Sequence, residues 1–152
     1  MAIQFTLTIL IFHGGWLLGD VFSDGELSLL AAYRCAAFVI MILGVFMLDR
    51  VHAALGDNFS PVLELKQSHQ LVRSGPYARI RHPMYTSGFL YLIGAGGLAA
   101  NLFVFICPLV SFSILVACRI PDEERMMAQR FGDAWLTHKN STGMFLPKLG
   151  IW

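Results

Sequence analysis

The sequence has few charged residues, and they are unevenly distributed. Asp, Glu, Lys and Arg make up 14% of the 152 residues and hydrophobic types 56%, whereas a typical soluble domain has about 25% charged and about 45–50% apolar residues. The first Lys or Arg is Arg34, and residues 84–118 contain no Asp, Glu, Lys or Arg. This scarcity argues against an ordinary soluble domain and predicts a membrane protein. The net charge of +1 gives a nucleic-acid partner no electrostatic support.

Cysteine is also scarce. Cys35, Cys107 and Cys118 form no Cys-x-x-Cys pair and lie in apolar stretches, where a thiol behaves as a small hydrophobe. We therefore expect no disulfide framework and no metal site. A basic n-region before the first apolar segment is lacking too, so we interpret that segment as a retained membrane helix rather than a signal peptide.

The apolar segments define the expected fold. Residues 3–18 and 27–48 are each interpreted as one crossing of a hydrocarbon core about 30 Å thick. The charge-free stretch would be about 52 Å long as one helix, too long for a single crossing, so it should fold back. Asn101 is polar and lies near its middle, which predicts a hairpin of helices over 84–100 and 102–118. Small residues before the turn, such as Gly94 and Gly97, favour close helix packing.

We expect an all-α integral membrane protein, a single domain over residues 1–152, with about four transmembrane helices and a C-terminal cytoplasmic helix. Every Lys and Arg except Arg34 lies in residues 49–83 or 119–152. The positive-inside rule places both segments, and both termini, in the cytoplasm of a multi-pass membrane protein. We expect its membrane to be the bacterial inner membrane. Pro121 suits the first turn of the C-terminal helix, with Glu123 and Glu124 near its positive end.

Two clusters of polar residues flank the hairpin. The first is Gly75-Pro-Tyr77-Ala-Arg79-Ile-Arg81-His82-Pro83-Met-Tyr85. It can be read as an interfacial anchor, but its prolines stiffen the backbone, which favours a site. The second is Arg119-Ile-Pro-Asp122-Glu123-Glu124-Arg125, which can be read as a solvated helix start. Because both ends of a hairpin emerge on one side, we expect the two clusters to be neighbours.

The motifs resemble those of the isoprenylcysteine carboxyl methyltransferase family, which is related to the phospholipid N-methyltransferases. The matching stretches are Leu55-Gly-Asp-Asn-Phe-Ser60, Leu71-Val-Arg-Ser-Gly75-Pro-Tyr77, Arg81-His82-Pro83-Met-Tyr85, Arg119-Ile-Pro-Asp-Glu123-Glu124, Arg130-Phe-Gly132-Asp-Ala-Trp135 and Pro147. The resemblance implies a methyltransferase-like catalytic region over residues 55–147, S-adenosylmethionine as methyl donor, and a cofactor pocket on the cytoplasmic side. It implies cofactor binding by Tyr77, His82, Pro83, Tyr85, Glu123 and Glu124, and a catalytic role for Arg81, His82 and Glu124.

The chemistry of this donor suits those residue types. Arg81 or His82 would pair with its carboxylate, and Glu123 or Glu124 would accept hydrogen bonds from its amino group or ribose hydroxyls. The ring of Tyr77 or Tyr85 would face the sulfonium. The acceptor would be a lipophilic small molecule or lipid from the bilayer; an isoprenylcysteine-like carboxylate, a thiol and a lipid amine all fit. Two alternatives stay open: a membrane reductase-like protein that uses NADPH, and a non-catalytic membrane protein of the same fold.

Overall fold

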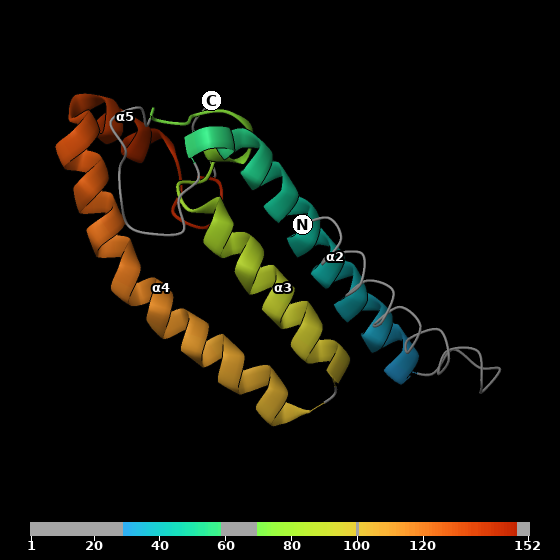
Figure 1. Cartoon of the computed structure of the whole chain (residues 1–152). Coiled ribbons are helices and arrows are strands. Elements are labelled where there is room, and N and C mark those ends of the chain that lie inside the picture. Colours follow the sequence, from blue (N-terminus) through green and yellow to red (C-terminus); the bar gives the residue numbers. More distant parts are fainter. Residues whose placement is uncertain (1–28, 59–69, 100, 149–152) are drawn as a thin grey trace.

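The computed structural model describes residues 29–58, 70–99 and 101–148, and these ranges are largely helical (Figure 1). The elements in chain order are α2 (Leu29–Leu55), the 3₁₀ helices η1 (Gly56–Asn58) and η2 (Gly75–Ala78), α3 (Pro83–Ala99), α4 (Leu102–Phe131) and α5 (Asp133–Ser141). The β-type pairing in these ranges is an isolated parallel bridge between Ile80 and Gly143. The all-helical expectation is confirmed here, while the crossing expected over residues 3–18 lies outside the described residues.

The charge-free stretch folds back on itself at Asn101, as predicted. α3 ends at Ala99 and α4 begins at Leu102. The Asn101 side chain caps α4, because its Oδ1 accepts hydrogen bonds from the backbone nitrogens of Phe103 at 3.0 Å and Val104 at 3.2 Å. In Figure 1, α3 and α4 meet at this turn and diverge toward the end of the molecule that carries α5. α2 and α4 are long and apolar enough to cross a membrane.

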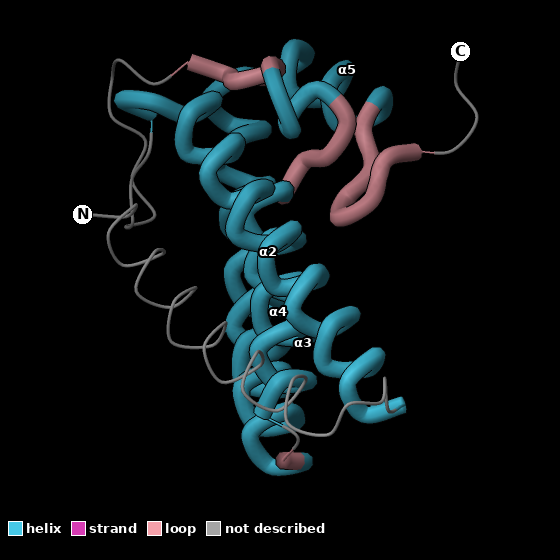
Figure 2. The backbone as a smooth tube through the Cα atoms, turned by 90° about the vertical axis from the view of Figure 1, so that its right-hand side faces the viewer, coloured by secondary structure: helices cyan, strands magenta, loops and turns pink. Residues whose placement is uncertain are grey.

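Glycines let α3 lie directly against the backbone of α2. A Cβ atom on Gly94 would lie 2.4 Å from the backbone nitrogen of Met41, and one on Gly44 would lie 2.6 Å from that of Tyr91. Met41 is fully buried in this contact and packs with Ala37. The predicted role of the small residues is therefore confirmed. Figure 2 shows the long helices running together along one axis, and α2 extends to Leu55, beyond the predicted residue 48.

The structure corrects the predicted position of Pro121. α4 continues without interruption from Leu102 to Phe131, with Pro121 in its interior, so the first-turn position is wrong. A proline costs the helix one backbone hydrogen bond; here the buried side chains of Val116 and Ile120 anchor the helix just before it. Glu123 therefore lies in the middle of a helix, and a helix dipole does not account for its charge. α4 ends at Gly132, whose φ of 50° only glycine adopts readily.

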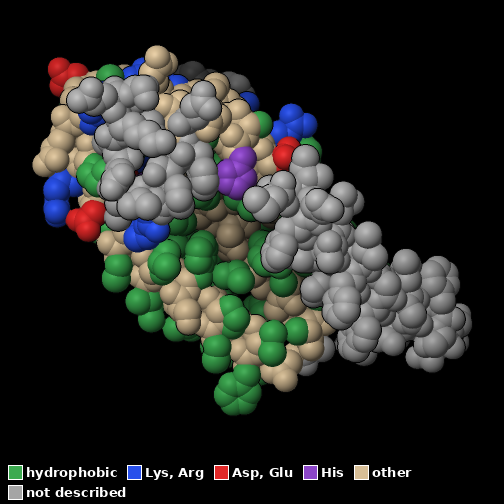
Figure 3. Space-filling model, viewed as in Figure 1, with side chains coloured by type: hydrophobic (Ala, Val, Ile, Leu, Met, Phe, Trp, Pro, Cys, Tyr) green, Lys and Arg blue, Asp and Glu red, His purple; other side chains and the backbone are tan. Residues whose placement is uncertain are grey.

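The outer surface of α4 is apolar. Leu102, Phe103 and Ile114 are 70%, 79% and 61% exposed. Figure 3 shows hydrophobic side chains covering the hairpin end of the visible face, while Lys, Arg, Asp and Glu gather toward the opposite end. Such a surface suits the hydrocarbon of a bilayer, with the charged end at its boundary. The polar clusters of the sequence lie at this charged end.

Candidate functional site

The carboxylate of Glu124, on α4, is the meeting point of the two clusters. Arg81 Nε donates to Glu124 Oε1 at 3.1 Å, and His82 Nε2 lies 3.4 Å from the same oxygen. Lys139, on α5, donates from Nζ to Glu124 Oε2 at 2.6 Å. The Glu124 side chain is only 14% exposed, so these contacts are poorly screened by water. Residues from two separate stretches of the chain thus share the carboxylate of a third.

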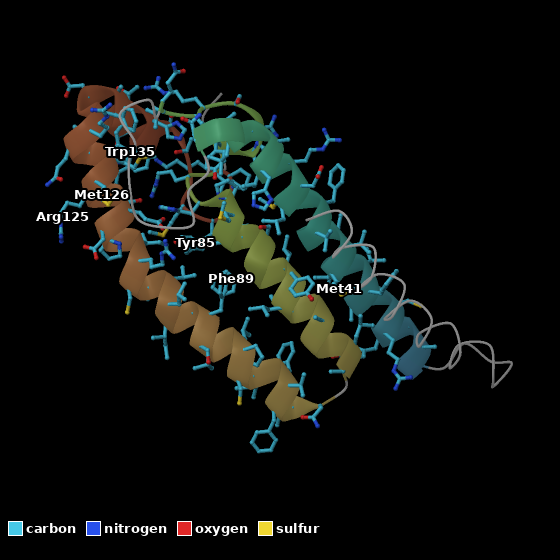
Figure 4. The ribbon with its side chains drawn as sticks, viewed as in Figure 1. Met41, Tyr85, Phe89, Arg125, Met126 and Trp135 are labelled. Atoms are coloured by element: carbon cyan, nitrogen blue, oxygen red, sulfur yellow. The ribbon has the colours of Figure 1, made fainter. Side chains whose placement is uncertain are left out.

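Glu123 takes part in the same network from the next position on α4. The Tyr85 hydroxyl donates a short hydrogen bond to Glu123 Oε1, and His82 Nδ1 lies 3.6 Å from Glu123 Oε2. Arg119 Nε approaches Glu123 Oε1 to 3.5 Å. The buried His82 ring therefore has one carboxylate beside each nitrogen, and it stacks on Tyr85 with ring centroids 5.8 Å apart. Figure 4 shows Tyr85 and Phe89 reaching from α3 toward α4.

A C-terminal strap, residues 142–146, holds the backbone that carries Arg81 and His82. Arg81 N donates to Gly143 O at 2.8 Å, Gly143 N donates to Arg79 O at 3.1 Å, and His82 N donates to Met144 O at 3.0 Å. The Thr86 hydroxyl donates to the next strap carbonyl, that of Phe145, at 2.8 Å. These bonds satisfy backbone groups that the turn before α3 leaves free, and they fix His82 in place.

Arg81 also ties α5 to the site. Its Nη1 donates to the carbonyl oxygens of Lys139 at 2.8 Å and Thr142 at 2.7 Å. Carbonyls at a helix C-terminus have no partner within the helix, and a cation satisfies both their hydrogen bonds and their partial charge. One guanidinium therefore binds Glu124 on α4 and the last turn of α5 together.

A mainly apolar pocket lies next to Arg81. It is lined by Leu55, Asn58, Gln70, Leu71, Val72, Tyr77, Arg81, Met127, Phe131, Trp135 and His138. Trp135 is buried, and its Nε1 has no hydrogen-bond partner among the described residues. A buried donor without an acceptor costs free energy, so this atom suits a ligand with an acceptor group. Figure 4 shows Trp135, on α5, next to the upper part of α4.

Two titratable groups in the pocket wall are held neutral. Burial, reinforced by the negative charge of Glu123, raises the pKa of the Tyr77 phenol well above its ordinary value. Burial, followed by the positive charges of Arg73 and Arg81, lowers the pKa of His138 below the ordinary 6.5. The pocket therefore offers a phenol and an uncharged imidazole, with the charged groups gathered beside it.

The structure brings most of the predicted site residues together. Arg81, His82, Tyr85, Glu123 and Glu124 form one connected network, which was predicted from the hairpin alone. Tyr77 lies in the adjoining pocket. Pro83 is buried as the first residue of α3, where proline is favoured, and contributes rigidity.

Sequence reasoning missed the contributions from the C-terminal end. Lys139 and the strap lie in a tail without a periodic pattern, and backbone bonds such as Arg81 N to Gly143 O carry no side-chain signal. The stretch from Arg130 to Trp135 was noted, but the unpartnered Nε1 of Trp135 becomes visible only in three dimensions.

Comparison with known proteins identifies relatives of this chain. Residues 35–129 match the family model of the isoprenylcysteine carboxyl methyltransferase (ICMT) family. The protein-S-isoprenylcysteine O-methyltransferase of Schizosaccharomyces pombe is 28% identical over 77% of this chain and 50% of its own length. That of Saccharomyces cerevisiae is 31% identical over 72% of this chain and 46% of its own length. The chain thus spans about half the length of these curated relatives.

A bacterial relative and a solved structure complete the comparison. The cobalt-zinc-cadmium resistance protein CzcN of Cupriavidus metallidurans is 29% identical over 57% of this chain and 40% of its own length. The structure of the eukaryotic intramembrane Ras methyltransferase ICMT aligns with 95% of this chain and 52% of that chain, with a TM-score of 0.71 and 23% identity. This structural likeness establishes the fold as that of an intramembrane helical protein.

Proposed function

Since the chain belongs to the isoprenylcysteine carboxyl methyltransferase family, we propose that it transfers a methyl group from S-adenosylmethionine to a lipophilic acceptor at the cytoplasmic face of a membrane. The observation that carries the proposal is the network of Arg81, His82, Tyr85, Glu123 and Glu124 at the charged end of membrane-length helices. Two motifs far apart in sequence share partly buried carboxylates there, beside an apolar pocket.

The residues present suit S-adenosylmethionine, which carries an amino group, a carboxylate, a ribose diol and a flat purine. Glu123 and Glu124 would accept hydrogen bonds from the amino group or the diol. Arg81 and His82 would offer positive charge or donors to the carboxylate. The apolar pocket suits the purine, since the unpartnered Nε1 of Trp135 would donate to a ring nitrogen there.

When bound, S-adenosylmethionine would supply an electrophilic methyl group, which passes to the acceptor in line with the breaking carbon–sulfur bond while S-adenosylhomocysteine leaves. The chain's own residues would mainly align donor and acceptor. Good alignment lowers the activation barrier by up to about 7–11 kcal/mol. The buried end of the site around His82 excludes water. The ring of Tyr85 would face the positive charge of the sulfonium.

The need for a base depends on the acceptor. A carboxylate acceptor reacts without losing a proton, whereas a thiol or an amine must release one. In the latter case His82 is the base that we propose, because it is buried and Glu124, 3.4 Å from its Nε2, holds the ring in place. Arg81 also bonds to Glu124 and to the last turn of α5, so besides offering positive charge to the donor's carboxylate it would hold Glu124 in position.

The acceptor would reach the site from the bilayer. The apolar face of α4 leads from the hairpin turn to Arg119, where the charged site begins. A lipid or a small lipophilic molecule could diffuse along this surface without crossing water. The positive-inside rule orients the site, and both termini, toward the cytoplasm.

The test is ligand binding and methyl transfer by the protein in nanodiscs. Titration calorimetry should detect S-adenosylhomocysteine binding and no NADPH binding. With a labelled donor and a lipid extract, wild type should label a lipid-soluble product, and Glu124→Gln should label none while still inserting into the membrane. Arg125→Gln is the matched control, since Arg125 is 69% exposed and pairs with Asp122. Full activity of Glu124→Gln would contradict the assignment; binding of NADPH would favour a reductase, and binding of neither ligand a non-catalytic role.

A further inference from the structure

Lys139 contacts both members of the partly buried Arg81–Glu124 ion pair. Its Nζ donates to Glu124 Oε2 at 2.6 Å, while its backbone carbonyl accepts from Arg81 Nη1 at 2.8 Å. The cycle closes through the bond from Arg81 Nε to Glu124 Oε1 at 3.1 Å. The Lys139 side chain is 43% exposed and the Glu124 side chain 14%, so the lysine reaches from the surface to a largely buried carboxylate.

The two oxygens of Glu124 have different partners. Oε1 is shared by Arg81 and His82, whereas Oε2 receives the ammonium of Lys139. Bonds on both oxygens fix the rotation of the carboxylate, and charge-assisted bonds are the strongest of their kind. Lys139 therefore sets the direction in which Glu124 presents its remaining lone pairs.

The same lysine docks a helix that cannot hold its position alone. α5 has 9 residues, too few for a stable isolated helix, and it begins after Gly132, whose φ of 50° breaks the path of α4. Trp135 and His138 of α5 line the apolar pocket. The bond between Lys139 and Glu124 thus connects the pocket wall to the carboxylate network.

We propose that Lys139 is a positioning residue, which orients the carboxylate of Glu124 and docks α5 against the pocket without touching either substrate. The proposal rests on the proposed function for the meaning of the site. It extends that function to a residue outside both sequence motifs, and it predicts that ligand binding depends on a cation at this position.

The test compares Lys139→Met, Lys139→Arg and the matched control Lys148→Met, each with wild type in nanodiscs. Lys148 is exposed and bonds to the carbonyl of Asn140, away from Glu124. Lys139→Met should weaken S-adenosylhomocysteine binding and raise the KM for S-adenosylmethionine by about 10-fold, the effect of one charge-assisted bond. Lys139→Arg should recover to within about threefold of wild type, which leaves about half of that loss in free energy, and Lys148→Met should match wild type. Unchanged binding by Lys139→Met, or no recovery by Lys139→Arg, would overturn the proposal.

A double variant separates positioning from general stability. Because Lys139 acts through Glu124, adding Lys139→Met to Glu124→Gln should weaken binding no further; a further loss would contradict the proposed route. If wild type binds no S-adenosylhomocysteine, the proposed function fails. Melting temperatures then test whether the contact between Lys139 and Glu124 stabilises the fold. If Lys139 and Glu124 are coupled, the decrease in melting temperature of the double variant should differ clearly from the sum of the decreases for Lys139→Met and Glu124→Gln. A decrease equal to that sum would overturn the proposal.

Discussion

His82 illustrates how single residues build this site. It is buried, it has a carboxylate beside each ring nitrogen, and its backbone nitrogen is bonded to the strap carbonyl of Met144. Neither Glu123 nor Glu124 could be buried at low cost without such partners, because an unpaired buried charge is strongly disfavoured. The charged residues of the site therefore depend on one another to be withdrawn from water.

His138 provides a prediction on pH dependence. Its folded-state pKa lies below the ordinary 6.5, because of burial and then of Arg73 and Arg81. The unfolded protein therefore takes up this proton more readily than the folded protein. The free energy of unfolding should be unaffected by His138 above about pH 6.5 and should fall as the pH drops below that value.

Melting temperatures between about pH 5 and about pH 8, the range in which histidine titrates, check this expectation. Wild type should lose more stability on acidification than His138→Gln. Other titrating groups are common to both proteins and cancel in the difference. Parallel pH profiles would show that His138 is not held neutral by the fold.

At the scale of structural elements, the strap holds the backbone of Arg81 and His82 in place. Gly143 lies where the strap folds back on itself, and a Cβ atom there would lie 1.8 Å from the carbonyl oxygen of Leu146. Gly143→Ala should therefore displace the strap and the backbone of Arg81 and His82 bonded to it. Since a displacement of about 1 Å at a site can cost about 100-fold in rate, methyl transfer should fall by a similar factor with insertion unchanged. Wild-type activity in this variant would show that the strap does not position the site.

The contact between α2 and α3 gives a prediction about stability. Gly94→Ala would push a Cβ atom into the α2 backbone at Met41, and such overpacking costs about 1–3 kcal/mol. Gly88→Ala, on the same helix, would meet the ring of Phe112, which can turn aside. The melting temperature should fall markedly for Gly94→Ala and much less for Gly88→Ala; equal effects would contradict the proposed backbone contact.

At the scale of the whole molecule, the sequence predicted the hairpin and the meeting of the two motifs. Both follow from one fact, that an uncharged stretch too long for a single crossing must turn, and Asn101 is its natural turning point. The continuity of α4 through Pro121 could not be predicted, because local rules favour proline at a helix start. Lys139 and the strap were missed for another reason: their roles depend on tertiary contacts that no local pattern encodes.

Cross-linking of His82 to Glu124 tests the central claim, that the hairpin joins two distant motifs into one site. In a background with Cys35, Cys107 and Cys118 replaced by alanine, cysteines are placed at His82 and Glu124, or at His82 and Phe103 as the control pair. A short bifunctional thiol reagent is applied to native membranes, and joined peptides are identified by mass spectrometry. The structure predicts efficient joining of the first pair and none of the second, because Phe103 lies at the hairpin turn. Joining of only the second pair would contradict the shared site and the methyl transfer proposed for it.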